Sequence, residues 1–305
     1  MRGIILAIGV LMICVLAGAV YAQVTRPDLT IPYINPALIT IDGLGIDWED
    51  PAVYPQAYML SSVDDPDYFG LVGGSELSGP EDFSAVLYLG WSTDNMLYGY
   101  SRVTDDVLQV GRPTNGNCWT EDNLEIMTDA GNIGGNYRWG DLDAEYAQMF
   151  GVRLKQGVAM GPGGNDDDTV CHIWASDEAA WITSPEFFYA VTDYPAGTTD
   201  VTYAYEFKLA LWDEVGLSVG ESRMHDAMAT YEAGVPIGLA IWWDDCDVKL
   251  GTRDTQIGTA GPEYLTYPGT SADYLNDAYL VGNPLYDVPV AVAPTSWGAV
   301  KASLK

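Results

Sequence analysis

The chain has 305 residues, and its 43 acidic residues against 13 basic ones give a formal net charge of −30 at pH 7. This excess argues against nucleic acid and anionic membranes as partners, because both repel an acidic protein. It is compatible with a neutral ligand, with divalent cations or with a salty environment.

The N-terminus has the features of a secretory signal peptide over residues 1–22. Arg2 supplies a positive start, and the apolar run from Ile4 to Val20 is short for a membrane span. The residues before Gln23 predict cleavage at that point, with an uncleaved anchor helix as the alternative. No other stretch is long and apolar enough to span a bilayer. We therefore expect an exported protein, extracellular or at the cell surface, with no membrane span after cleavage and with a short extension over residues 23–37.

Alternation of apolar and polar residues predicts strands along most of the remaining chain. Residues 85–91 and 97–103 form a predicted hairpin around the turn Thr93-Asp94-Asn95. The clearest strand is 201–211, where every second residue is apolar. Further strands are predicted over 123–128, 151–155, 187–191, 236–242 and 278–281. A short helix over 224–231 is expected to end at Gly234.

Many short strands separated by Gly, Pro and Asn turns are typical of an all-β protein. We predict an antiparallel, jelly-roll-like β-sandwich with little helix. No linker divides the chain, so one domain is expected over residues 38–283, followed by a tail over 284–305. Cys118, Cys171 and Cys246 remain after cleavage. Because their number is odd, we expect one disulfide and one buried thiol, with the pairing left open.

Five local motifs follow one another in a recognisable order. They are Ile39-Thr-Ile-Asp-Gly43 with Trp48, the segment from Asp94-Asn-Met-Leu-Tyr98 to Val103-Thr-Asp105, Trp119-Thr-Glu-Asp122-Asn-Leu-Glu125, Tyr203-Ala-Tyr-Glu206 leading to Trp212, and Asp244-Asp245-Cys-Asp247. This series resembles the family-nine carbohydrate-binding modules and the wider DOMON-like group. The resemblance implies a jelly-roll-like sandwich, commonly stabilised by calcium, that occurs free or attached to extracellular polysaccharide-degrading enzymes.

The resemblance also implies a saccharide site. A pyranose ring has apolar faces and a polar rim, so aromatic rings and hydrogen-bonding side chains together bind it. The family's first clamp residue is here Trp119, with Glu121, Asp122 and Glu125 close by in the sequence. The alternative is that Trp119 only packs the sandwich. The family's second clamp Trp is absent, and the replacements that we predict for it are Tyr267 and Tyr274, with Tyr264 in the same stretch.

Two more pairs of neighbours complete the predicted sites. Trp242 and Trp243 point to opposite faces of one strand, so one is expected in the core and the other, which we assign as Trp243, at the ligand. Asp244, Asp245 and Asp247 at the strand end offer the hard oxygen ligands that Ca²⁺ prefers, and Asp105 is of the same kind. A solvated acidic turn is the alternative for this metal site. Trp48, Trp91 and Trp212 are expected in the core.

No motif in the chain predicts catalysis, because hydrolase, zinc-protease and phosphate-loop patterns are absent. Two unrelated histidines do not predict haem, which is not expected. We therefore predict a secreted, non-enzymatic protein that binds a neutral polysaccharide or oligosaccharide by aromatic stacking and is stabilised by Ca²⁺. The alternative is a self-assembling extracellular subunit of a filament, surface layer or matrix. The tail over 294–301 resembles those of many secreted bacterial proteins, and we interpret it as a sorting or docking peptide, with an exposed strand that pairs with a sheet edge as the alternative.

Overall fold

The structure is a computed structural model. It describes residues 28–50, 58–61, 70–74, 79–110, 118–137, 145–154, 170–174, 188–191, 194–215, 222–247, 253–259 and 271–282. The predicted signal peptide, Tyr264, Tyr267 and the C-terminal tail lie outside these residues. Within the described part of the chain, none of the helices is long and apolar enough to cross a membrane.

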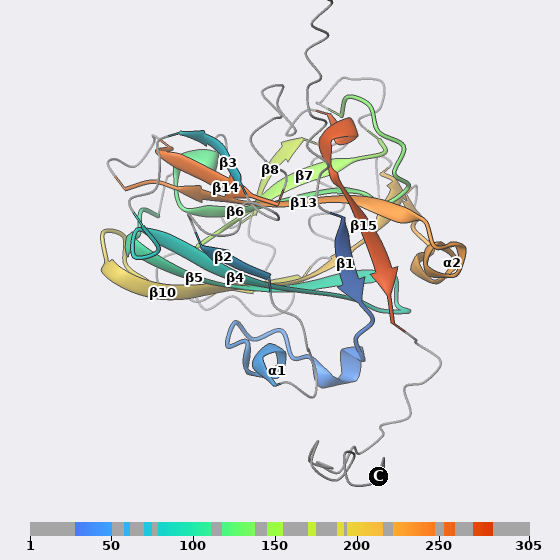
Figure 1. Cartoon of the computed structure of the whole chain (residues 1–305), viewed down its shortest axis with the longest axis horizontal. Helices are drawn as coiled ribbons and strands as arrows, with labels where there is room; N and C mark the ends of the chain where they lie inside the picture. Colours follow the sequence, from blue (N-terminus) through green and yellow to red (C-terminus); the bar gives the residue numbers. More distant parts are fainter. Residues whose placement is uncertain are drawn as a thin grey trace, which may run out of the picture.

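Most of the described strands form two stacked β-sheets (Figure 1). The larger sheet has eight strands. Its path runs through β1 (Leu29–Pro32), β15 (Asn276–Val281), β13 (Pro236–Asp245), β6 (Asn123–Asp129), β7 (Gln148–Arg153) and β8 (Val170–Trp174), while β14 (Thr255–Gly258) pairs with β13 and with β3 (Gly70–Gly74). Its pairings are antiparallel, except that β1 runs parallel to β15.

The smaller sheet is antiparallel throughout and has five strands. Their order is β2 (Tyr58–Ser61), β4 (Phe83–Trp91), β5 (Met96–Val107), β10 (Thr199–Ala210) and β9 (Phe188–Val191). A separate ribbon pairs β11 (Trp212–Glu214) with β12 (Arg223–Met224). This architecture confirms the predicted β-sandwich, and the predicted hairpin is the β4–β5 pair.

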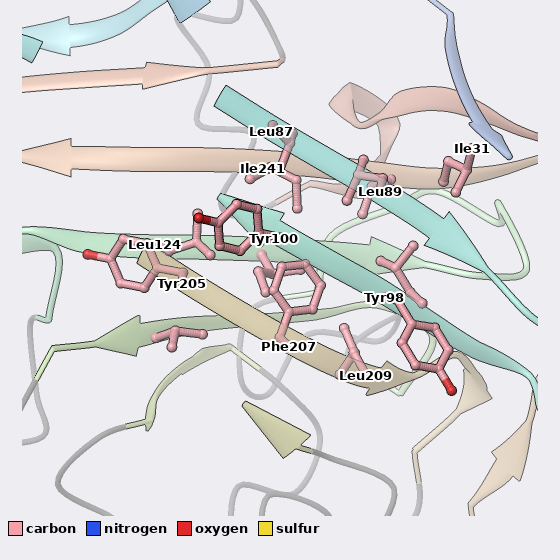
Figure 2. Close-up of a cluster of buried hydrophobic side chains, with 14 of the residues drawn as sticks. Ile31, Leu87, Leu89, Tyr98, Tyr100, Leu124, Tyr205, Phe207, Leu209 and Ile241 are labelled. Atoms are coloured by element: carbon pink, nitrogen blue, oxygen red, sulfur yellow. The ribbon is translucent and has the colours of Figure 1, made fainter. Parts of the chain in front are cut away.

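The alternation read from the sequence explains how the sheets pack. Along β10, Tyr205, Phe207 and Leu209 point inward and are buried. They meet side chains of the opposite sheet, including Leu124 of β6 and Ile241 of β13 (Figure 2). Trp48, Trp91 and Trp212, expected in the core, are at most 3% exposed.

Among the described residues, helical structure is limited to short segments, in keeping with the prediction of little helix. They are α1 (Ile46–Glu49), α2 (Ala227–Ala233) and the 3₁₀ turns η1 (Pro36–Leu38), η2 (Cys118–Thr120) and η4 (Ala272–Tyr274). Gly234 ends α2 in a left-handed conformation with φ of 64°, which a residue without a Cβ adopts at little cost.

The first and fourth motifs of the resemblance meet on the outer face of the smaller sheet. Glu206 of β10 accepts hydrogen bonds from the backbone N–H groups of Asp42 and Gly43, at 2.8 and 2.7 Å, and from the indole Nε1 of Trp48 at 2.7 Å. The Ile-Asp-Gly…Trp segment is therefore held against β10 by one buried carboxylate.

Candidate functional site

The outer face of the larger sheet carries a second, smaller apolar cluster. Trp242 and Trp243 are consecutive on β13 and point to opposite faces. Trp243 lies in the main core, whereas Trp242 lies in the outer cluster, against which Trp119 packs. The other buried members of the cluster are Met127, Tyr137, Ala147, Met149, Ala240, Ala272 and Leu275. The face thus presents Trp119, Tyr137 and Trp242 together.

Gly258 makes room for the Trp242 ring on this face. It is the partner of Trp242 in the β13–β14 register. A Cβ at this position would lie 1.9 Å from Cδ1 of Trp242, so the indole covers the glycine backbone directly. The indole Nε1 is buried and has no hydrogen-bond partner among the described residues.

Beside these rings lies a hydrogen-bonded set of polar side chains, which we call the outer-face network. It consists of Asn123, Glu125, Asp244, Arg253 and Gln256. Asp244 is at its centre: it accepts from Arg253 Nη1 at 3.1 Å, from Gln256 Nε2 at 3.0 Å and from Asn123 Nδ2 at 3.2 Å. Gln256 Nε2 also donates to Glu125 Oε2 at 3.0 Å. The amide oxygen of Asn123 is buried and accepts no hydrogen bond within the described residues.

The charges of the outer-face network balance. Burial, and then the charge of Asp244, raise the pKa of Glu125 well above its usual value. Burial also raises the pKa of Asp244, to about 6, against the opposing effect of Arg253. The raised pKa favours the protonated, neutral form of Glu125, while the carboxylate of Asp244 pairs with Arg253. The network as a whole is then close to neutral, as suits an uncharged ligand.

A second polar group lies between the two sheets, at the end of β13 and the start of β6. Six aspartates form it: Asp82, Asp105, Asp106, Asp122, Asp245 and Asp247, which we call the cation cluster. It contains three overlapping groups of three carboxylates, and the ligand atoms within each group lie within 4.8 Å of one another. Asp105, Asp245 and Asp247 each belong to two groups, so the cluster is continuous.

The residues of the cation cluster fit a divalent cation. One carboxylate oxygen of each of Asp106, Asp245 and Asp247 is buried without a hydrogen-bond partner in the described part of the chain. Burial, and then the charge of Asp247, raise the pKa of Asp245 to about 9. Burial likewise raises the pKa of Asp247 to about 8, with Asp106 as the next cause. A bound divalent cation would supply the positive charge that balances these carboxylates.

The predicted metal residues separate between the two groups. Asp245 and Asp247 belong to the cation cluster, but Asp244 points to the other face of β13 and is bonded to Arg253, Gln256 and Asn123. Its place is therefore in the outer-face network, because consecutive residues of a strand alternate between faces.

The predicted ligand residues divide in the same way. Trp119 and Glu125 lie on the outer face, and Glu121 is buried there in an ion pair with Arg153. Asp122 belongs to the cation cluster, where its carboxylate accepts from the backbone N–H of Cys246 at 2.8 Å. Tyr274 is half-buried in η4, between Ala272 and Leu275 of the outer cluster. Tyr267 lies outside the described residues.

One assigned ligand residue needs correction. Trp243 is fully buried between the sheets, and its Nε1 donates to Ser101 Oγ at 2.9 Å. A ligand on the outer face cannot reach it, and its neighbour Trp242 takes the outward position. The sequence predicts that Trp242 and Trp243 face opposite sides of the strand, but it does not indicate which of the two faces the core.

Sequence reasoning missed several residues of both groups. Arg253 and Gln256 belong to no quoted motif and reach the outer-face network only because β14 pairs with β13. Asp82 and Asp106 are distant in sequence from Asp244, Asp245 and Asp247. Period-two alternation along β6 and β13 could have separated Asp122 from Glu125 and Asp245 from Asp244.

Two solved structures of a family-nine carbohydrate-binding module from Caldicellulosiruptor kristjanssonii share this fold. The complex with cellotriose is 15% identical, has a TM-score of 0.50, and the match covers 84% of this chain and 94% of that one. The complex with glucose is 14% identical, with the same TM-score, and the match covers 84% and 96% of the two chains. This similarity confirms the resemblance at the level of the fold. No family model matches the chain, and neither does any curated protein.

Proposed function

We propose that the protein is a non-catalytic module that binds a neutral saccharide on the outer face of the larger sheet. The observation that carries the proposal is the juxtaposition of Trp119 and Trp242 with the outer-face network. Aromatic rings can stack on the C–H faces of a sugar, while amide, carboxylate and guanidinium groups bind its hydroxyls. The bound sugars of the two structural neighbours, cellotriose and glucose, support the choice of ligand class.

Trp119 is the aromatic of this face on which the proposal depends most. It is partly exposed, whereas Trp242 and Tyr137 are at most 3% exposed. The network beneath is charge-balanced and pre-ordered by its own hydrogen bonds, which lowers the entropy cost of binding. Two buried atoms at this face, Asn123 Oδ1 in the network and Trp242 Nε1 in the outer cluster, are an acceptor and a donor without a partner among the described residues.

The test is calorimetric titration of the mature protein with cellotriose, together with a panel of soluble polysaccharides. We expect reversible binding, weakened about tenfold by Trp119→Ala, the factor that corresponds to about 1.4 kcal/mol of lost stacking. Tyr88→Ala is the matched control, because Tyr88 is a partly buried aromatic on the smaller sheet. Absence of binding to every saccharide, with concentration-dependent polymerisation, would instead favour the structural-subunit alternative.

Calcium is the second part of the proposal, and its place is the cation cluster. Asp82, Asp105, Asp106, Asp122, Asp245 and Asp247 would hold the ion, which would neutralise their mutual repulsion and join the two sheets. Binding to the folded state at a hundred times the dissociation constant would add about 2.7 kcal/mol of stability.

This part is tested by melting the protein in millimolar Ca²⁺ and in excess chelator at matched ionic strength. Each kcal/mol of added stability raises the melting midpoint of a chain of this size by about 2–4 °C, so the midpoint should be about 5–10 °C higher in Ca²⁺. Equal midpoints would remove the site, and an equal rise with NaCl would indicate charge screening alone.

We also propose that the chain is exported and loses residues 1–22. The positive charge of Arg2, the apolar run from Ile4 to Val20 and the residues before Gln23 support this. N-terminal sequencing of the protein recovered from its source should begin at Gln23, and a start at Met1 would contradict cleavage.

A further inference from the structure

The outer-face network and the cation cluster lie back to back on the same two strand ends. On β13, Asp244 belongs to the network, and the next residue, Asp245, belongs to the cluster. On β6, Asn123 belongs to the network, and the preceding Asp122 belongs to the cluster. Each strand therefore carries one side chain of each group on adjacent residues.

Hydrogen bonds join these strand ends into one unit. Asn123 and Asp244 are direct partners in the β6–β13 register and are bonded at 3.2 Å. The carboxylate of Asp122 accepts from the backbone N–H of Cys246 at 2.8 Å, two residues beyond Asp244. A change in the separation of the two strand ends would therefore move the cluster and the network together.

We propose that a cation in the cluster and a saccharide on the outer face bind cooperatively. The inference rests on the proposed function and adds a regulation of the same site. Without a cation, the ionised aspartates of the cluster, which come from both sheets, repel one another, and this repulsion opposes the register that sets Asn123 beside Asp244. A cation between them stabilises that register, so the saccharide meets a larger fraction of binding-competent protein.

The coupling is reciprocal, which makes it measurable from both sides. Typical coupling between two sites changes affinity about 5- to 150-fold, and we expect about tenfold here, because the two groups share two strands. Ca²⁺ should tighten cellotriose binding by that factor, and saturating cellotriose should tighten Ca²⁺ binding by the same factor.

The experiment is titration of cellotriose into the mature protein, once in saturating Ca²⁺ and once in excess chelator, at matched ionic strength. The reverse titration adds Ca²⁺ with and without saturating cellotriose. Asp245→Asn, a change confined to the cluster, should lose the Ca²⁺ dependence of cellotriose affinity. Asp28→Asn makes the same charge change at an exposed residue and should keep that dependence. Should Asp245→Asn fail to fold, the half-buried Asp247 takes its place as Asp247→Asn.

The outcomes separate the two proposals. Equal cellotriose affinity in Ca²⁺ and in chelator would overturn the coupling and leave the saccharide site standing. Absence of cellotriose binding and of binding to the saccharide panel, even in saturating Ca²⁺, would overturn both proposals. A tenfold change that persists in Asp245→Asn would place its origin outside the cluster and would also overturn the inference.

Discussion

Glu206 holds the N-terminal part of the domain to the sheet, and its substitution by glutamine gives a sharp test of that role. The carboxylate is 1% exposed and accepts three hydrogen bonds. Oε2 accepts the two backbone N–H groups of Asp42 and Gly43, and Oε1 accepts the indole N–H of Trp48. Glutamine has one acceptor oxygen, so its amide nitrogen must face one of these donors.

The best orientation of the glutamine keeps the two backbone bonds and turns the NH₂ group toward Trp48. One hydrogen bond to a charged group is then lost, which costs about 1.5–3 kcal/mol, and the other two weaken because their acceptor becomes neutral. Burial raises the pKa of Glu206, so removing the charge relieves part of this cost. We expect a net loss of about 2–3 kcal/mol, or about 4–12 °C in the melting midpoint.

Thermal unfolding followed by circular dichroism measures this loss. The matched control is Lys208→Gln on the same face of β10, where a partly exposed ion pair with Asp94 at 2.9 Å contributes about 1 kcal/mol or less. A Glu206→Gln midpoint within about 2 °C of the wild type, or no lower than that of the control, would show that the Glu206 carboxylate does not hold this segment.

The cation cluster, the Trp242 ring and the Cys246 thiol each give a further measurable outcome. Without Ca²⁺, in a chelator whose affinity does not depend on pH, the free energy of unfolding should fall between about pH 6 and about pH 8. The reason is that folded Asp245, with a pKa of about 9, still holds a proton that the unfolded chain has released. One such group lowers the free energy of unfolding by about 1.4 kcal/mol per pH unit. Saturating Ca²⁺ should flatten this slope, and equal slopes would contradict the reasoning. Gly258→Ala, whose methyl would lie 1.9 Å from Trp242, should weaken cellotriose binding several-fold, whereas Gly131→Ala, whose methyl meets Ile133 at 3.2 Å, should not. Cys246 is a free, buried thiol, so peptide mapping should find it alkylated only after unfolding; labelling of the native protein would refute its burial.

The sequence by itself determined the fold class and most of the strands. Along β10, alternation places Tyr205 and Phe207 inward and Glu206 outward, because side chains of a strand point to opposite faces in turn. The β4–β5 hairpin and the end of α2 at Gly234 follow from equally local rules. Several strands of two to five residues were not predicted, because most runs of this length carry too little alternation to be recognised alone; they are β1, β2, β3, β8, β11, β12 and β14.

Only the tertiary structure decided which residues form each site. Asp244 and Asp245 look equivalent in the sequence, yet one joins Arg253 and Gln256 on the outer face and the other joins Asp105 and Asp122 between the sheets. Trp242 and Trp243 are separated in the same way. Alternation predicts that two neighbouring residues of a strand point to opposite faces of the sheet. Which of these faces becomes the core is decided by how the two sheets stack, because burial depends on contacts between strands that are distant in the chain.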